Sequence, residues 1–473
     1  MSAYAFPPLA FPSMASLTFP VHDPATGALV DMVTDHTPDD ARAAIVRAHG
    51  AWSEWRERPA ADRARLLRRW HDALLDHKRP LADLMTREAG KVHAESLGEV
   101  DYAASFVEWF AEEARRSYGE IIPSPSRDRR LLVLRQSIGV VAAITPWNFP
   151  LAMITRKVAP ALAAGCPVII KPATETPLTA LYAERLAHEA GIPAAVYCTL
   201  PTSHNAEMGA VFFEDARVRK VSFTGSTAVG KQLVAQSAQH LTRLSLELGG
   251  NAPVLVFDDA DIERAVRGTM AAKFRHNGQT CVCVNRVFVQ AGVHDRFVAQ
   301  LAQAVQALRS GPPRDTSVQV GPLISERATD KVYQLVHDAV EAGAQLLCGG
   351  QVHDGRWFEP TVLADVRADM RISQEEIFGP VAAVQRFETE ADVLARANDT
   401  PYGLAAYVYS ENAARCWRVA EALEYGMVGV NESLIGTTVA PFGGVKQSGM
   451  GREGSKQGLE AFQEIKYVCY GGL

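Results

Sequence analysis

The chain lacks a block of basic residues and lacks any long apolar run. Its formal net charge is −6 over 473 residues, which argues against nucleic acid or an anionic membrane as its main partner. No stretch approaches the roughly 20 apolar residues that a membrane-spanning helix needs. We therefore expect neither a nucleic-acid-binding protein nor a membrane protein.

Targeting signals and a disulfide framework are also missing from the sequence pattern. No Lys or Arg precedes Arg42, so neither a secretory leader nor a basic transit peptide is indicated. The seven cysteines are odd in number and scattered, which disfavours a disulfide scaffold and fits a reducing compartment. These features predict a cytoplasmic protein.

What is present is a long globular chain that opens with helices. Its length and its 47% hydrophobic content predict two or three domains rather than disorder. A Pro-rich, extended stretch reaches about residue 36. Thr37-Pro38-Asp39-Asp40 then supplies the hydroxyl cap, the proline and the acids that favour a helix start. Helical periodicity continues to about Arg116.

From Ile138 onward, short apolar runs alternate with helical segments. This alternation predicts a parallel sheet with helical crossovers, with strands expected at residues 140–144, 168–170, 195–200, 221–223 and 254–257. The pattern resumes after Asn285, with a strand at 287–289, helices at 295–308 and 325–342, and a strand at 346–348. It therefore predicts a second α/β domain.

Two segments fit neither domain. Residues 117–136 have the pattern of a projecting hairpin, and residues 464–468 have that of a single strand near the end of the chain. Lone strands can pair with each other or with another subunit. Both segments therefore favour an oligomer.

Three side chains in Gly- or Pro-marked turns carry the candidate chemistry. Cys281 lies in Gly-Gln-Thr-Cys, Glu247 in Glu-Leu-Gly-Gly-Asn, and Asn148 in Pro-Trp-Asn-Phe-Pro. A thiol attacks a carbonyl, a carboxylate activates water, and a carboxamide N–H stabilises an oxyanion. Together they are the parts needed to oxidise an aldehyde through a thioester.

The chain resembles the aldehyde dehydrogenase superfamily from about residue 20 to its end. The motifs that carry the resemblance occur in family order and are Thr145–Pro150, Lys171–Ala173, Phe223–Thr227, Glu247–Asn251, Gly278–Cys281, Glu375–Pro380 and Pro441–Gly444. Within the superfamily, the closest likeness is to the succinate-semialdehyde dehydrogenases. It is carried by Met153–Lys157, Lys273–Arg275, Cys281–Cys283, Gly449–Lys456 and Ile465–Tyr470.

The resemblance implies an α/β fold with three parts. These are a Rossmann-like cofactor-binding domain at residues 1–116 and 138–248, a catalytic α/β domain at 249–440, and a small β oligomerisation arm at 117–137 and 441–473. It also implies a homodimer or homotetramer that acts on a small aldehyde.

The resemblance further implies how the three reactive side chains act. Cys281 is the nucleophile, the Asn148 amide and the Cys281 backbone N–H hold the oxyanion, and Glu247 is the base for thioester hydrolysis. A free thiol has a pKa of about 8.5, so we expect a helix dipole or backbone N–H groups to assist Cys281. We expect Glu247 at a strand end facing a cleft, with a pKa raised by burial.

Cys283 follows the nucleophile by two residues and permits a second hypothesis. In a strand the two thiols would share a face, and a reversible Cys281–Cys283 disulfide would make activity sensitive to oxidants. Cys-x-Cys alone lacks two ligands for a metal site, and His276 does not have ligand spacing. We therefore expect no metal.

The cofactor expected from the resemblance is NADP or NAD. Gly449–Gly454 matches G-x-G-x-x-G but does not follow a strand inside a βαβ unit, so the diphosphate site is expected at Gly225 and Ser226, where a helix begins near Thr227. Thr174 replaces an acid that NAD-preferring members often carry, which favours NADP or dual use. The other cofactor-binding residues implied are Trp147, Asn148, Lys171, Leu248, Glu376 and Phe378.

The expected substrate carries a carboxylate remote from its aldehyde. Arginine suits such a group because it binds it in bidentate fashion. The resemblance implies Arg156, placed about two turns along one helix from Asn148, together with Arg275, and it places Thr437 where the subgroup has a serine. His276 also replaces the usual asparagine.

The sequence therefore predicts NAD(P)-dependent oxidation of succinate semialdehyde to succinate. The Thr437 and His276 departures leave room for another ω-carboxylated aldehyde, such as glutarate semialdehyde. A non-catalytic binding protein on the same scaffold is the alternative from a different class.

Overall fold

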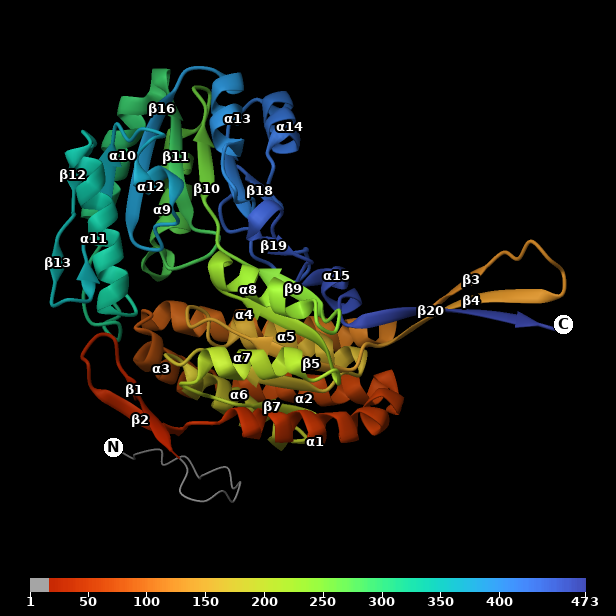
Figure 1. Cartoon of the computed structure of the whole chain (residues 1–473). Helices are drawn as coiled ribbons and strands as arrows, with labels where there is room; N and C mark the ends of the chain where they lie inside the picture. The colour runs from red at the N-terminus through yellow and green to blue at the C-terminus, as the bar shows by residue number, and fades with distance from the viewer. Residues whose placement is uncertain (1–16) are drawn as a thin grey trace.

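The computed structural model describes residues 17–473. Two α/β units lie one above the other, and a thin arm projects from the side of the molecule (Figure 1). Of the stretch expected to be extended, residues 1–16 lie outside the described residues, and the rest forms a hairpin of β1 (Thr18–His22) and β2 (Leu29–Thr34). Within residues 17–473, no helix has both the length and the apolar character needed to cross a membrane.

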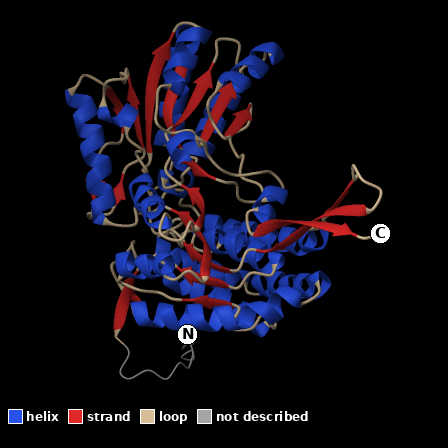
Figure 2. Cartoon of the chain, turned by 45° about the vertical axis from the view of Figure 1, so that its right-hand side comes forward, coloured by secondary structure: helices blue, strands red, loops and turns tan. Residues whose placement is uncertain are grey.

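The first unit is a six-stranded sheet between two layers of helices (Figure 2). Its strand order is β19-β9-β8-β5-β6-β7, and all strands are parallel except β19. The strands are β5 (Val140–Ile144), β6 (Val168–Lys171), β7 (Tyr197–Thr199), β8 (Val218–Thr224), β9 (Arg243–Glu247) and β19 (Gly449–Met450). The helices are α1 (Pro38–Glu57), α2 (Ala60–Asp76), α3 (Lys78–Ala89), α4 (His93–Glu113), α5 (Ala152–Ala164), α6 (Pro177–Glu189), α7 (Asn205–Glu214), α8 (Thr227–Ser237) and α15 (Ser455–Glu460).

The central strand β5 shows why this sheet needs helices on both faces. All five of its residues are buried. Val141 and Ala143 join the core formed with α2 to α6, whereas Val140 and Ala142 join the core formed with α1, α7 and α8. Alternate residues of a strand point to opposite faces, so a wholly apolar strand requires two covered faces.

The second unit is a seven-stranded sheet of order β12-β15-β16-β11-β10-β17-β18, in which only β12 runs antiparallel. The strands are β10 (Ala252–Val256), β11 (Val284–Gln290), β12 (Gln345–Cys348), β15 (Thr361–Ala364), β16 (Val381–Phe387), β17 (Ala405–Tyr409) and β18 (Met427–Val430), with a small hairpin of β13 (Val352–His353) and β14 (Trp357–Phe358). The helices are α9 (Ile262–Phe274), α10 (His294–Gln306), α11 (Glu326–Glu341), α12 (Arg371–Gln374), α13 (Glu390–Asn398) and α14 (Ala413–Ala422).

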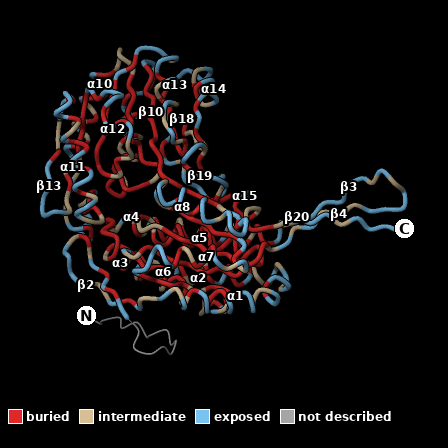
Figure 3. The backbone as a smooth tube through the Cα atoms, in the orientation of Figure 1, coloured by how far each residue is buried: buried red, intermediate tan, exposed pale blue. Residues whose placement is uncertain are grey.

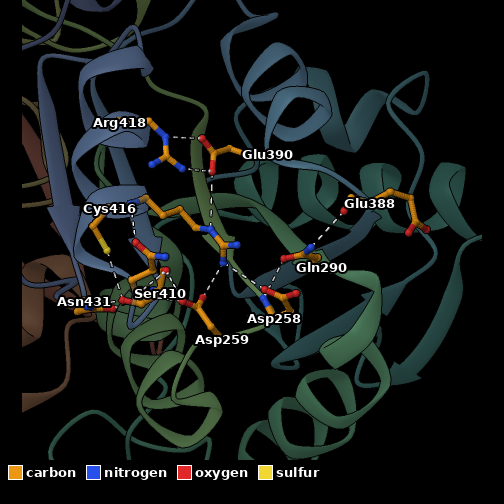
Figure 4. Close-up of polar contacts among 11 residues, drawn as sticks. Asp258, Asp259, Gln290, Glu388, Glu390, Ser410, Cys416, Arg418 and Asn431 are labelled. Carbon is orange, nitrogen blue, oxygen red and sulfur yellow. Dashed lines mark hydrogen bonds and ion pairs between the residues drawn. The ribbon is translucent and has the colours of Figure 1, made fainter.

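The carboxyl ends of the second sheet are tied together by polar contacts (Figure 4). Arg415 of α14 pairs with Asp258 and Asp259, which follow β10, at 3.1 and 2.8 Å. It also reaches Glu390 at the start of α13, and the Ser410 hydroxyl after β17 donates to Asp259. The protein's own ion pairs therefore occupy this end, and the amino ends of the sheet face the first unit (Figure 1).

The arm consists of β3 (Glu120–Ile122), β4 (Arg129–Ser137) and β20 (Gln463–Gly471). β20 pairs antiparallel with the whole of β4. Of the two pairings expected for the lone strands, the one between the hairpin and the terminal strand is therefore observed. The arm is mostly exposed, in contrast to the buried interiors of the two units (Figure 3).

The predicted α/β class with a parallel Rossmann-like sheet is confirmed, and so are several local predictions. Thr37 caps α1 in a capping box with Asp40, and Pro38 lies in the first turn. The domain boundaries stay a prediction. Within the tail that the sequence assigns to the arm, the short strand β19 pairs with β9 in the first sheet, and α15 packs against α4 and α5.

Candidate active site

A cavity of about 610 Å³ lies where the two units meet. Segments at the carboxyl ends of β5, β8 and β9 enter it from the first unit, and segments preceding β10, β11 and β16 enter it from the second. The residues that line it and bear on the chemistry are Glu95, Glu99, Tyr102, Trp147, Asn148, Arg156, Thr224, Gly225, Ser226, Glu247, Leu248, Arg275, His276, Thr280, Cys281, Glu376, Phe378 and Gly436. The structure therefore brings together most of the side chains that the sequence singled out.

Polar atoms without a hydrogen-bond partner gather around this cavity. Within the described residues, both carboxylate oxygens of Glu247, the hydroxyls of Thr224 and Thr280, and both ring nitrogens of His276 are buried and unpartnered. Buried polar groups are normally paired in folded proteins. These particular groups lie at the cavity beside the candidate reactive residues, where a ligand, a substrate or a water molecule would pair with them.

The candidate nucleophile follows a left-handed stretch of backbone. After α9 ends at Phe274, His276, Asn277 and Gly278 have φ values of 48°, 57° and 74°. A non-glycine residue in this region costs on the order of 1 kcal/mol, so surrounding contacts must hold the segment. The Asn277 side chain donates to the Pro322 carbonyl at 2.7 Å and accepts from the Gly321 N–H at 2.8 Å.

Burial governs the ionisation of Cys281. It raises the pKa of the Cys281 thiol to about 12, with Arg156 acting in the opposite direction and Glu247 adding to the rise. Assistance from the dipole of α9 is excluded, because Cys281 follows the carboxyl end of that helix, where the dipole is negative. Assistance from backbone N–H groups stays a prediction. Because of its raised pKa, the thiol in this structure is protonated at neutral pH.

Cys283 does not share a strand face with Cys281. Cys281 and Val282 form a turn, and β11 begins only at Val284. The Cys283 Sγ donates to the Lys273 carbonyl at 3.4 Å, and both cysteines are free thiols. The expected strand geometry is wrong, and the reversible disulfide stays a hypothesis.

Glu247 is the last residue of β9 and is buried at the wall of the cavity. Burial, followed by the nearby Glu453 carboxylate, raises its pKa well above the ordinary value. Gly443 gives the carboxylate its space, since a Cβ there would lie 2.9 Å from Glu247 Oε1. The expected cleft-facing strand end and the raised pKa are both found.

Asn148 lies in the bend between β5 and α5, and its side chain points across to the nucleophile segment. Its amide Nδ2 donates to the Gln279 carbonyl at 2.9 Å, two residues before Cys281. The expectation that Asn148 and Arg156 share one helix is wrong, since α5 begins at Ala152. The two side chains nevertheless line the same cavity.

The first sheet offers a site suited to a dinucleotide. Its order reverses between β5 and β8, and ligands of such sheets bind outside the carboxyl ends of the strands at that reversal. Gly225 and Ser226 follow β8 and line the cavity, and Ser226 caps α8. The positive end of an 11-residue helix, with its unpaired N–H groups, fits a diphosphate.

The opposite wall would hold the nicotinamide half of such a cofactor. Trp147 and Phe378 pack edge to face at 5.6 Å between ring centres, and Leu248 and Glu376 line the wall beside them. Glu376 accepts from the Gly250 N–H at 3.2 Å, and burial raises its pKa to about 7. The residues present therefore fit the group, and their individual roles stay predictions.

Lys171 is the last residue of β6, Thr174 follows it by three residues, and neither lines the cavity. Burial lowers the pKa of Lys171 to about 8, with Glu175 opposing the shift. The Thr174 hydroxyl donates to the Thr202 carbonyl at 3.0 Å and accepts from the Asn205 amide at 3.0 Å. Glu175 is exposed.

The two candidate substrate arginines have different surroundings. Arg156 is buried, pairs with Glu453 at 2.7 Å, and lies 4.2 Å over the Phe442 ring. Arg275 is partly exposed at the cavity wall, 5.6 Å from the Phe149 ring centre. Arg156 shares its counter-ion Glu453 with Lys157 and keeps a buried Nη2 without a hydrogen-bond partner, whereas Arg275 has the more open position at the cavity wall.

Thr437 is exposed and lies outside the lining of the cavity, whereas its neighbour Gly436 lines it. A Cβ at Gly436 would lie 3.5 Å from the Tyr102 hydroxyl, an ordinary contact distance. The structure therefore brings position 436, rather than 437, to the cavity.

Sequence reasoning missed the charged groups behind the cavity. Glu453 is buried against Arg156 and Lys157, which hold its pKa below the ordinary value although burial alone would raise it. Glu95 and Glu99 of α4 also line the cavity. The spacing of Glu95 and Glu99, four residues apart on one helix face, is the only sequence signal that could have pointed to them. Such pairs of acids are common on solvent-exposed helices, so the spacing alone does not indicate a site.

The sequence profile of the aldehyde dehydrogenase family matches residues 12–468. The succinate-semialdehyde dehydrogenase [NADP(+)] GabD of Escherichia coli is 53% identical over 453 residues, covering 95% of this chain and 94% of that protein. The mitochondrial succinate-semialdehyde dehydrogenase of Homo sapiens is 53% identical over 464 residues, covering 97% of this chain and 87% of that protein.

Solved structures show the same relationship in three dimensions. The crystal structure of succinate-semialdehyde dehydrogenase from Burkholderia pseudomallei matches with a TM-score of 0.95 at 51% identity, covering 96% of this chain and 95% of that one. The sequence profile, the sequence relatives and the fold agree over nearly the full length. This chain belongs to the aldehyde dehydrogenase family.

Proposed function

We propose that the protein oxidises succinate semialdehyde to succinate with NADP, or with both NADP and NAD, as hydride acceptor. The relatives named for this activity cover nearly the whole chain. The observation within this structure that carries the proposal is the joint placement of Cys281, Glu247, Asn148 and Arg275 around one cavity.

The reaction starts with the thiol. Cys281 Sγ attacks the aldehyde carbon and gives its proton to a water molecule, which carries it to solvent, and the oxyanion that forms accepts N–H hydrogen bonds from Asn148 and from the Cys281 backbone. Losing one such donor typically costs about 10²- to 10³-fold in rate. When bound, the dinucleotide supplies the hydride acceptor that turns the hemithioacetal into a thioester.

Hydrolysis then requires a base. Glu247, whose carboxylate oxygens have no protein partner, takes a proton from a water molecule, and that water attacks the thioester carbon. The acid leaves and the thiol is regenerated. A carboxylate at this place favours water over a second thiol as the acceptor of the acyl group.

Substrate choice is assigned to Arg275, with Arg156 as a second positive charge. The test compares succinate semialdehyde with a neutral four-carbon aldehyde, by absorbance of the reduced nicotinamide. Arg275→Gln should lower kcat/KM for the carboxylated aldehyde by about 10- to 100-fold, because a charge-assisted contact contributes about 1.5–3 kcal/mol. It should leave the neutral aldehyde unaffected.

Arg267→Gln, on an exposed side chain of the neighbouring helix α9, is the matched control. Equal activity of the wild-type protein on both aldehydes would contradict the substrate assignment. Parallel assays with NADP and NAD test the cofactor assignment, which is supported by the absence of an acidic side chain at Thr174.

A longer ω-carboxylated aldehyde, such as glutarate semialdehyde, is the second candidate substrate. It is favoured by Gly436, which leaves space next to the Tyr102 hydroxyl where a side chain would otherwise stand. Adding glutarate semialdehyde to the same panel of aldehydes decides between the two substrates, since the preferred one should have the higher kcat/KM.

The arm supports a homo-oligomer. β3 and β20 are the outer strands of the arm's sheet, and exposed apolar side chains gather on the arm at Ile121, Leu134, Ile465, Tyr467 and Tyr470. Exposed strand edges that carry apolar residues are typical sites of association between protein chains. A second copy of the chain supplies a matching surface by symmetry.

A further inference from the structure

The face of α4 that lines the cavity carries two acids one turn apart, and each one reaches a different reactive segment. Glu95 accepts the His276 backbone N–H with both oxygens, at 3.0 and 2.9 Å. Glu99 accepts the backbone N–H groups of Leu151 and Ala152 at 3.0 and 3.2 Å. Residues four apart lie on the same side of a helix, so one rigid element contacts both segments.

Each contact is made where the backbone most needs it. His276 is the first of the three left-handed residues that lead to Cys281. Leu151 and Ala152 begin α5, whose start has no side-chain cap of its own and directly follows the Asn148 bend. Glu99 therefore acts as the cap of α5, and Glu95 holds the strained end of the nucleophile segment.

The same helix face also joins the two units. His276 belongs to the polypeptide of the second unit, whereas Leu151 and Ala152 belong to the first. Lys91, which precedes α4, pairs with Glu99 and lies 3.9 Å over the Phe149 ring. One helix thus supports both the thiol segment and the oxyanion-donor segment, in addition to the direct hydrogen bond from Asn148 to the Gln279 carbonyl.

We propose that Glu95 is a positioning residue, which holds the Cys281 segment at a fixed place relative to Asn148 by accepting the His276 N–H, while Glu99 anchors the Asn148 side. The proposal rests on the proposed role of Cys281 as nucleophile. It requires an acceptor atom of the correct reach at position 95, and it does not require a negative charge there.

Two substitutions separate reach from charge. Glu95→Gln keeps the length and one acceptor oxygen but removes the charge. Glu95→Asp keeps the charge but shortens the side chain by one methylene. Both preserve most of the side-chain volume, so both proteins should fold. Glu108→Gln and Glu108→Asp, on an exposed residue of the same helix, are the matched controls.

The readouts are kcat and KM for the aldehyde and the rate at which iodoacetamide alkylates Cys281, followed by mass spectrometry of its peptide. Glu95→Asp should lower kcat by up to about 10²-fold for a displacement near 1 Å, with KM for the aldehyde little changed, and its alkylation rate should differ from wild type because the surroundings of the Cys281 thiol change. Glu95→Gln should stay near wild type, as should both Glu108 variants.

If the Glu95→Asp protein turned over faster than the Glu95→Gln protein, the negative charge at position 95 would be what matters, and the proposal would be overturned. Equal losses in both variants, or no loss in either, would overturn it as well. The alkylation rate needs no substrate, so a wrong substrate assignment leaves this test intact. If Cys281 were not the nucleophile, turnover would persist in Cys281→Ser, which separates that failure from this one.

Discussion

At the scale of single residues, the site combines a thiol and a carboxylate that both resist ionisation. Burial raises the pKa of Cys281 to about 12 and that of Glu247 well above its ordinary value. The free protein therefore holds a neutral thiol in the same cavity as a carboxyl group whose raised pKa suits a general base. Arg156 is the charge that most strongly opposes the rise at Cys281, so positive charge near the thiol favours the thiolate.

The reactivity of Cys281 in the free protein should follow the raised pKa. Only the thiolate is alkylated, and its fraction grows about tenfold per pH unit below the pKa. The alkylation rate by iodoacetamide should therefore rise steadily from neutral to alkaline pH. Peptide mass spectrometry at several pH values checks this, and a plateau near the ordinary thiol pKa would contradict it.

Glu453 should tune the base. Its carboxylate helps to raise the pKa of Glu247, and it also neutralises Arg156 and Lys157. Glu453→Gln removes a negative charge and frees two positive ones, so the pKa of Glu247 falls and thioester hydrolysis persists to lower pH. The steady-state rate after the burst, measured by stopped flow at several pH values, tests whether the pH profile moves to lower pH.

The same substitution should lower stability, because an uncompensated buried charge costs about 3–5 kcal/mol. Glu464→Gln, in an exposed pair with Arg243, should change neither property. An unshifted pH profile in a folded Glu453→Gln protein would show that Glu453 does not act on Glu247.

At the scale of elements, loops at strand ends create the site, and glycines let them approach each other. Gly278 has φ 74°, and a Cβ there would lie 2.2 Å from the Gly379 carbonyl oxygen. The nucleophile loop therefore packs directly on the loop that carries Glu376 and Phe378.

Gly278→Ala should separate these two loops. We expect a loss of stability on the order of 2 kcal/mol from the strained φ and the backbone clash, together with weaker cofactor binding. Gly292→Ala is the control, since nothing lies within 4 Å of a Cβ there and its φ is ordinary. Thermal unfolding of both variants measures the difference, and equal Tm values would contradict the account.

Elements were predictable from sequence to the extent that local signals define them. The Thr37 cap and the apolar run at 140–144 gave a helix start and a strand that the structure confirms. The short strand β19 was missed because two residues carry no periodicity, and only tertiary pairing with β9 defines it. The bend that separates Asn148 from α5 was also missed, although Pro150 is a breaker signal.

The site was predictable where a motif names a residue, and less so where packing decides. Cys281, Glu247 and Asn148 each lie in a marked turn, and the structure brings them to one cavity. The choice between Gly436 and Thr437 depends on the path of a loop without regular structure. The partnership of Arg156 with Glu453 joins residues 297 positions apart by number (453 minus 156), which no local pattern reveals.

At the scale of the whole molecule, the two sheets present opposite ends of their strands to the cavity. The first contributes the carboxyl ends of its strands to the cavity, as open parallel sheets usually do. The second contributes its amino ends, while ion pairs around Arg415 tie its carboxyl ends together (Figure 4). The reactive groups therefore come from both units, and α4 contacts both.

The arm should control assembly and should not take part in chemistry. Ile465→Lys combined with Tyr467→Lys places two charges on its exposed outer strand β20, where burial in an interface would be costly. Light scattering coupled to size-exclusion chromatography should report a smaller assembly than wild type. An unchanged mass would exclude this strand from the interface.

The central claim is that an acyl group passes through Cys281 and leaves by water that Glu247 activates. The most direct measurement mixes Glu247→Gln protein with succinate semialdehyde and oxidised cofactor, and follows both reduced cofactor and protein mass. The account predicts a burst of about one reduced nicotinamide per site, then arrest, with one succinyl group on the Cys281 peptide. Continued turnover, or a burst without an adduct on that peptide, would contradict it.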